Sequence, residues 1–259
     1  MAASTVMTLL AFKLILTPVL IVAVSLVGRR WGPKTGGLLA GLPLTSAPVS
    51  AFLAVEQGTD FAAKAAVGTL SGVGSVGVFC LAYVLAAKRW GWVVCTSVGI
   101  LCFLFVTGVF RLVALGLIAS LLVTASVLGA VLVSLPRGVT RAVVRQRPAW
   151  DLPGRALAAT GLVLLLTGAA PILGARLSGL LSPFPVFASV LAAFSHAHDG
   201  PGASMLLLRG IVLASFGFAG FFLVAGWGLP RWGIEFTFAV ASVVAMAISW
   251  LTYHLDHAA

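Results

Sequence analysis

Long apolar stretches run through the whole chain, separated by short connections that hold most of the charged residues. About 20 consecutive apolar residues are enough to cross a bilayer as a helix. This pattern predicts an all-α chain with nine membrane-spanning helices, over residues 7–28, 36–57, 62–87, 91–109, 112–135, 154–173, 175–196, 203–228 and 232–254. The longest connection, residues 136–153, is predicted to be a basic linker between them.

The composition excludes a water-soluble protein. Of the 259 residues, 61% are hydrophobic and 8% are charged, and the mean hydropathy is +1.15, whereas soluble domains are about 25% charged. Because so few charged side chains cannot form a water-facing surface, we expect the exterior to face the lipid bilayer. The net charge of +10 lies mainly in the short connections, which is typical of membrane topology and not of a nucleic-acid partner.

The basic residues divide unequally between the two sides of this predicted topology. Lys13 and Arg209 lie within or near the ends of spans and are not counted. One side holds Arg29, Arg30, Lys34, Lys88, Arg89, Arg137, Arg141, Arg145, Arg147 and Arg155, and the other holds Lys64, Arg111, Arg176 and Arg231. Since cytoplasmic loops carry the excess of basic residues, we expect the N-terminus outside and the C-terminus inside. The predicted location is the cytoplasmic membrane of a bacterium.

An internal repeat relates the two halves of the chain. At an offset of 138 residues, the second and seventh spans match without a gap at Pro33, Gly36, Gly41, Leu42, Leu53 and Ala54, which correspond to Pro171, Gly174, Gly179, Leu180, Leu191 and Ala192. After a short insertion at residues 196–199, the offset becomes 142. The triplet at residues 89–91, Arg-Trp-Gly, then matches the same triplet at residues 231–233.

This repeat predicts an inverted 4+1+4 organisation. Residues 1–109 form the first repeat, residues 110–153 form a connector span with the basic linker, and residues 154–259 form the second repeat. Because an odd number of spans separates equivalent helices, the two repeats cross the membrane in opposite directions. Inverted repeats of this kind are typical of secondary transporters.

Two equivalent spans are interrupted by proline near their centres, around residues 43–48 and 182–185. Proline removes a backbone donor and clashes with the preceding turn, so Pro43 and Pro48 break the second span. Pro183 and Pro185 break the seventh span in the same way. Irregular backbone at membrane depth persists only where protein or a water-filled cavity satisfies it. The sequence therefore predicts two broken helices that cross at the bilayer midplane.

A half-helix that begins at the midplane exposes free N–H groups and the positive end of its dipole, which attract an anion. The predicted substrate site combines these ends with the hydroxyls and prolines of the breaks: Pro43, Thr45, Ser46, Pro48, Ser50, Ser182, Pro183, Pro185 and Ser189. Carbonyls freed at the ends of the first half-helices could hold a cation such as sodium. The coupling ion is expected to be sodium or a proton. The alternative is that the prolines only kink two packed helices.

The segment at residues 36–43, Gly-Gly-Leu-Leu-Ala-Gly-Leu-Pro, resembles the glycine-rich, proline-terminated segments of broken-helix membrane families. These include the cation-proton antiporters and the AbrB and LrgB-type bacterial membrane proteins. The resemblance covers eight residues and implies an inverted-repeat carrier whose site is carried by Pro43, Thr45, Ser46 and Pro48. Unlike the antiporters, this chain has no carboxylate at the middle of a span.

Other polar residues are candidates for coupling, gating or metal binding. Glu56, Asp60, Arg209 and Glu235 lie within spans or at their ends, where an ionisable side chain is a functional candidate. A surface ion pair between Asp60 and Lys64 is the alternative for the first two. His196 and His198 are weak metal candidates on a predicted flexible loop. Asp151 and Asp256 are predicted to be solvated, in the linker and in the C-terminal tail.

These features together favour a secondary active transporter of a small anionic or zwitterionic solute. The alternatives are an ion channel or an accessory subunit of a membrane complex. A membrane-embedded enzyme is less favoured, because the chain lacks clustered carboxylates or cysteines that could hold a catalytic metal. We expect no cofactor beyond a coupling ion, and analogy with other inverted-repeat carriers suggests a homodimer.

Overall fold

The computed structural model describes residues 2–113, 115–136, 148–181 and 184–258. In these residues the chain forms helices joined by short turns and contains no strand, so the predicted all-α class is confirmed for them. The helices are α1 (Ala2–Trp31), α2 (Pro33–Ala40), α3 (Ser46–Gln57), α4 (Thr59–Ala86), α5 (Trp92–Leu112), α6 (Leu117–Ser134), α7 (Asp151–Leu181), α8 (Val186–Asp199), α9 (Pro201–Trp232) and α10 (Ile234–Ala258).

Six helices in the described part of the chain are long and apolar enough to cross a membrane. They are α1 (from Leu14), α4, α5 (to Phe110), α6, α9 and α10 (to Asp256). Their apolar side chains are exposed on the outside of the bundle, for example Phe105 on α5 and Leu122 on α6. Such surfaces are stable in lipid and not in water. The chain is therefore a multi-pass membrane protein.

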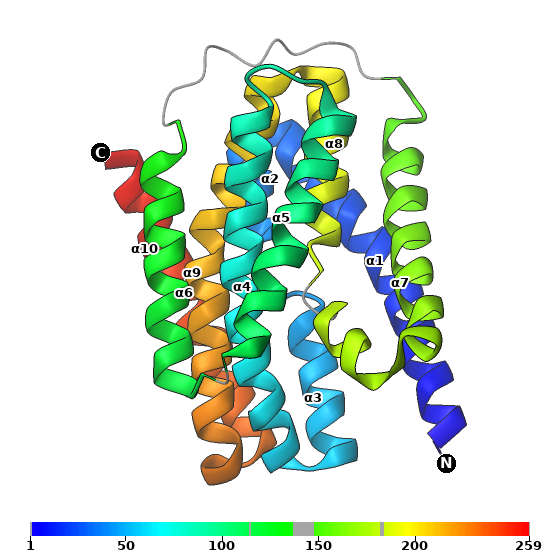
Figure 1. Cartoon of the computed structure of the whole chain (residues 1–259), viewed down its shortest axis with the longest axis vertical. Coiled ribbons are helices and arrows are strands. Elements are labelled where there is room, and N and C mark those ends of the chain that lie inside the picture. Colours follow the sequence, from blue (N-terminus) through cyan, green and yellow to red (C-terminus); the bar gives the residue numbers. More distant parts are fainter. Residues whose placement is uncertain (1, 114, 137–147, 182–183, 259) are drawn as a thin grey trace.

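The helices form one bundle with two ends (Figure 1). We call the upper end in Figure 1 the Asp256 end; it holds the starts of α2, α7 and α9 and the ends of α1, α8 and α10. The lower end, the Glu56 end, holds the α3–α4 and α9–α10 turns. Helices α4 and α9 run in opposite directions through the interior and are the most buried of the candidate spans. Around them pack α2, α5, α6, α8 and α10.

Glycines bring α2 and α9 into backbone contact. A Cβ at Gly37 would overlap the carbonyl oxygen of Leu207, and one at Gly210 would overlap the carbonyl oxygen of Lys34. At Gly41, a Cβ would lie 2.7 Å from the carbonyl oxygen of Ile211. Small residues at four-residue spacing allow this approach between membrane helices. The glycine-rich segment at residues 36–43 therefore serves helix packing as well as the break that follows it.

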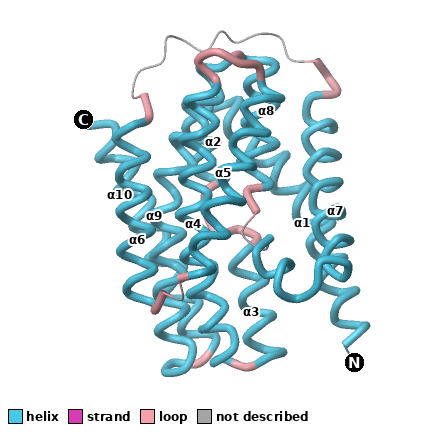
Figure 2. The backbone as a smooth tube through the Cα atoms, viewed as in Figure 1, coloured by secondary structure: helices cyan, strands magenta, loops and turns pink. Residues whose placement is uncertain are grey.

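The second span is broken, but at residues 41–45 and not throughout 43–48. Figure 2 shows the loop between α2 and α3 near mid-height in the bundle. Pro43 is buried in the break, and its carbonyl accepts the Ala47 N–H at 2.9 Å. Pro48 instead lies in the first turn of α3. Proline is tolerated there because the first N–H groups of a helix have no partner within it.

The chain between α7 and α8 differs in part from the prediction of two separate spans, 154–173 and 175–196. Helix α7 is unbroken from Asp151 to Leu181, and Figure 1 shows it turning inward before it ends. A helix can bend at a residue such as Pro171 without ending, because only one backbone donor is lost. Helix α8 then begins at Val186 after Pro185. The predicted site residues Ser182 and Pro183 lie outside the described residues.

Candidate functional site

The two half-helices α3 and α8 begin near mid-height and run toward opposite ends, α3 toward the Glu56 end and α8 toward the Asp256 end (Figure 1). Between Lys34 and Glu56 the sequence has no charged residue. The same is true between Arg176 and Asp199, apart from the two histidines. The polar character of both breaks therefore comes from backbone groups, hydroxyls and helix dipoles.

In the first break, Thr45 is the N-cap residue of α3, and its side chain makes no capping hydrogen bond. Thr45, Ser46 and Pro48 are partly exposed, whereas Ser50 is buried one turn further along α3. The Leu44 N–H bonds the Leu42 carbonyl at 2.8 Å, which closes a tight turn before the helix starts. The predicted hydroxyls of this break thus lie together at the start of α3.

In the second break, Pro185 is buried and is the N-cap of α8. The Ser189 hydroxyl is also buried and donates to the Pro185 and Val186 carbonyls, at 2.9 and 3.0 Å. The hydroxyl therefore bonds back to the first turn of α8, where the Pro185 carbonyl also accepts the Ser189 N–H at 2.9 Å. The Phe184 ring packs edge-on against Phe103 of α5, with centroids 5.6 Å apart. The second break is thus more closely packed than the first at its described residues.

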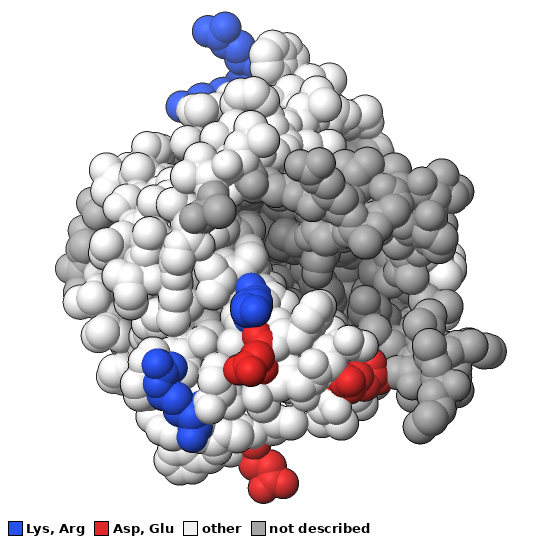
Figure 3. Space-filling view, turned by 60° about the horizontal axis from the view of Figure 1, so that its bottom comes forward, with Lys and Arg blue, Asp and Glu red and all other residues white. Residues whose placement is uncertain are grey.

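The acidic candidates at the Glu56 end stand apart from these breaks. Glu56, Asp60 and Glu235 are exposed, and no ion pair involves them in the described part of the chain. The alternative prediction of a pair between Asp60 and Lys64 is wrong there, since both side chains are exposed to water, which weakens such pairs. Figure 3 shows this face with a few scattered charged side chains.

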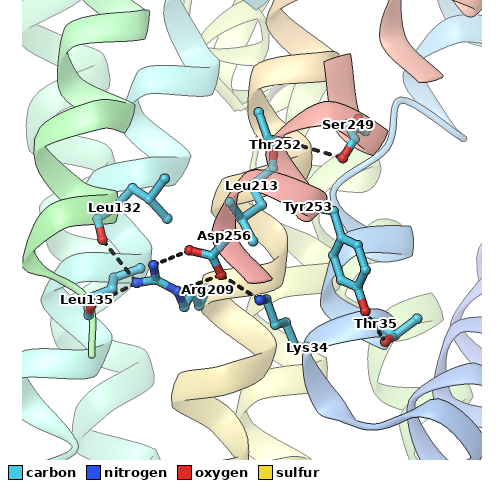
Figure 4. Close-up of polar contacts among 10 residues, drawn as sticks. All are labelled: Lys34, Thr35, Leu132, Leu135, Arg209, Leu213, Ser249, Thr252, Tyr253 and Asp256. Carbon is cyan, nitrogen blue, oxygen red and sulfur yellow. Dashed lines mark hydrogen bonds and ion pairs between the residues drawn. The ribbon is translucent and has the colours of Figure 1, made fainter. Parts of the chain in front are cut away.

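At the other end, Lys34, Arg209 and Asp256 form a buried ion cluster, which we call the Asp256 cluster (Figure 4). The Arg209 side chain is 1% exposed and bonds both oxygens of Asp256 through Nε and Nη2. Its Nη1 donates to the carbonyls of Leu132 and Leu135, at 3.0 and 2.8 Å. Lys34 Nζ lies 2.5 Å from the same carboxylate. The cluster joins α2, α9 and α10 to the end of α6.

The prediction that Asp256 is solvated in a tail is therefore wrong, because α10 continues to Ala258 and carries this carboxylate back onto α9. Arg209 is one of the predicted candidates for coupling or gating. Its guanidinium bonds a carboxylate and two carbonyls of the protein. The sequence contains one indication that Asp256 is not solvated. Asp256 follows Tyr253 by three residues, and both lie on one face if the helix continues through them. The hydroxyls of Tyr253 and Thr35 share a hydrogen bond of 3.3 Å.

A second buried cluster lies at the Asp256 end, centred on Asp151 at the start of α7. Its carboxylate pairs with Arg29 of α1 at 2.6 Å and with Arg155 at 3.0 Å, and its other oxygen lies 3.2 Å from His198 Nδ1. The prediction that Asp151 is solvated is wrong, because its side chain is 0% exposed. Burial alone would raise the pKa of Asp151, but Arg155 and Arg29 hold it below its ordinary value.

The two candidate metal ligands His196 and His198 belong to α8 and not to a flexible loop. Residues two apart on a helix point in different directions. His196 Nδ1 lies 3.2 Å from the hydroxyl of Tyr83 on α4, whereas His198 faces Asp151. Among the described residues, no group of three or more His, Cys, Asp or Glu side chains could hold a metal ion. Each histidine instead contacts a different neighbouring helix.

Comparison with protein families, with curated proteins and with solved structures found no match for this chain.

Proposed function

We propose that this protein is a secondary active transporter of a small anionic or zwitterionic solute. The observation that carries the proposal is that two half-helices, α3 and α8, start from proline-containing breaks near mid-height and run in opposite directions. In inverted-repeat carriers, half-helix N-termini at the bilayer midplane bind the solute and freed carbonyls bind the coupling ion. The breaks around Pro43 and Pro185 likewise combine the N-terminus of a half-helix with irregular backbone.

The packing supports the inverted 4+1+4 repeat on which this proposal depends. In the repeat, α3, α4 and α5 correspond to α8, α9 and α10. Helix α5 packs on α4 as α10 packs on α9, and α3 packs on α4 as α8 packs on α9. Helix α5 reaches α8, and α10 reaches α3 in return. If each of these helices is replaced by its equivalent in the other repeat, the same helix pairs are in contact. A pseudo-two-fold axis between the central helices α4 and α9 would produce this pattern.

The chemistry of the breaks favours a negatively charged or zwitterionic solute. No charged side chain lies in either break, so a bound anion would meet the N-terminal ends of α3 and α8 and the hydroxyls of Thr45 and Ser46. Each helix end contributes about half an elementary charge. The basic residues at the Asp256 end favour a cytoplasmic orientation for that end, in the inner membrane of a bacterium.

The test combines ligand-dependent stability with transport in vesicles. The purified protein is heated with acetate, succinate, phosphate, glutamate or alanine, in sodium or potassium and at two pH values. A solute that binds the folded state raises the Tm. The solute that does so is then used, radiolabelled, in counterflow with proteoliposomes. We expect saturable uptake, and we expect Thr45→Ala with Ser46→Ala to lower its kcat/KM by about 10-fold or more, from the loss of two hydrogen bonds.

The matched control is Ser97→Ala on α5, whose hydroxyl is exposed and bonds only its own helix, at the Val93 carbonyl. This variant should transport like the parent. Absence of any Tm shift and of any counterflow with the whole panel would contradict the proposal. Unsaturable conductance in planar bilayers would support an ion channel in its place.

A further inference from the structure

We propose that the Asp256 cluster is an ionic latch that closes the Asp256 end of the transport path, and that it must open for solute to pass this end. The inference deepens the proposed function and depends on it. Its basis is a cluster that ties the helix before the first break to three other helices and that has no counterpart at the other end among the described residues (Figure 4).

The cluster holds α2 in place from two sides. Lys34, in the first turn of α2, pairs with Asp256 at 2.5 Å, and its ammonium lies 5.3 Å from the centre of the Tyr253 ring. Thr35 bonds the hydroxyl of Tyr253. On its other side, α2 packs against the α9 backbone at Gly210. Helix α2 leads directly into the break at residues 41–45, so any movement of that half-helix at this end must release these contacts.

Arg209 connects the latch to the bundle interior. Its guanidinium bonds Asp256 through two nitrogens and the last carbonyls of α6 through the third. Those carbonyls have no partner within α6, because they lie at its C-terminal end. The charge of Arg209 is thus balanced by one carboxylate, and the same carboxylate also holds Lys34. Asp256 is therefore the residue on which the whole latch depends.

The opposite end has no matching cluster in the described residues. Glu56, Asp60 and Glu235 are exposed there, and Figure 3 shows the charged side chains of that face scattered over its surface. In the repeat alignment, Val67 and Ile172 stand at the positions equivalent to Arg209 and Lys34, so the sequence cannot form a second copy of the latch. The two ends of an inverted repeat can exchange conformations, but in the part of the chain that the structure describes, buried ion pairs hold only the Asp256 end together.

The packing of neighbouring helices against glycine also differs between the two ends of the bundle. Gly210 of α9 contacts the backbone of α2, whereas its repeat equivalent on α4, Gly68, is exposed, and no atom of the described residues lies within 4 Å of a Cβ built there. Among the described residues, helix packing is thus tighter at the Asp256 end than at the Glu56 end. In a carrier with alternating access, this corresponds to a state that is closed at the Asp256 end.

Hydrogen–deuterium exchange of the full chain in lipid nanodiscs tests the latch without any solute. The variants are Asp256→Asn and the milder Lys34→Gln, whose side chain is 19% exposed and whose loss leaves the Arg209–Asp256 pair intact. The control is Lys64→Gln, which removes an exposed lysine at the other end. We expect peptides from the start of α2 and the end of α10 to exchange about 10-fold faster in both latch variants. Peptides from the α3–α4 turn should exchange more slowly.

Faster exchange at both ends would show a structural brace and overturn the latch, and so would unchanged exchange at the Asp256 end. If Asp256→Asn fails to fold, Lys34→Gln still decides between these outcomes. Because the readout needs no solute, its result is independent of transport. The expected exchange pattern without flux for any solute would contradict the proposed function and leave an ion-held conformational change at this end.

Discussion

Asp256 and Arg209 are 47 residues apart in the chain, yet the guanidinium of Arg209 bonds both oxygens of the Asp256 carboxylate inside the bundle. Two charges buried together depend on one another, because either one left alone keeps the cost of desolvation without the compensating attraction. The pair therefore connects the energetics of α9 to the last turn of α10, and through Lys34 to α2.

The first prediction concerns this dependence. Arg209→Gln and Asp256→Asn should each destabilise the protein by about 3–5 kcal/mol, because each leaves a buried charge without its main partner. The double variant should cost clearly less than the sum of the two single changes. Thermal unfolding of the four proteins in one detergent measures this coupling. Strict additivity of the Tm changes would show that the two side chains do not act as a pair.

The second prediction uses a pair of repeat-equivalent glycines. Gly210→Leu should lower the Tm strongly, because any Cβ at this position overlaps the α2 backbone. Gly68→Leu should leave the Tm nearly unchanged, because no atom of the described residues lies within 4 Å of a Cβ built at this position. If the two ends alternate as proposed, Gly68 must pack closely in the other state, so Gly68→Leu should still abolish counterflow. Normal transport by Gly68→Leu would contradict the exchange of conformations between the repeats.

The sequence predicted those features that have a local cause. Pro43 breaks the second span because a missing donor and a steric clash act on adjacent residues, wherever the rest of the chain lies. The all-α class and the membrane setting follow from apolar runs that are equally local. The position of Pro48 was predicted less well, since a proline in a first turn and a proline in a break have the same sequence signal.

The burial of Asp151 and Asp256 could not be predicted in this way. Both lie next to segments that appear polar in the sequence, and their partners come from helices more than 45 residues away, apart from Arg155. Whether a carboxylate is solvated or paired depends on the tertiary contacts of the helix that carries it. The sequence contains one indication for Asp256, because helical periodicity continues through Tyr253 and Asp256 and places both on one face. That indication predicts a buried carboxylate only if the covered face of α10 is known.

The third prediction concerns pH and Asp151. Its pKa is lowered from an ordinary value of 3.8 by Arg155 and Arg29, which outweigh the effect of burial. A carboxylate with a lowered folded-state pKa contributes stability that is fully present above its unfolded pKa and is lost as pH falls through the folded value. The Tm should therefore be insensitive to this residue's titration above pH 5 and fall below about pH 4. Asp151→Asn should have a lower Tm at neutral pH and a flatter profile in acid. Parallel profiles for the two proteins would contradict this role.

The fourth prediction concerns the histidines of α8. Because His196 faces Tyr83 and His198 faces Asp151, the two rings are held by different helices and have no common position for a metal ion. Micromolar Zn²⁺ should not raise the Tm of tag-free protein, and EDTA should not lower it, since only a ligand that prefers the folded state shifts the melting. Tyr83→Phe should lower stability by about 0.5–1.5 kcal/mol, because it removes one buried hydrogen bond to His196. A rise in Tm with Zn²⁺ that disappears in both His196→Ala and His198→Ala would show instead that α8 rearranges to bind metal.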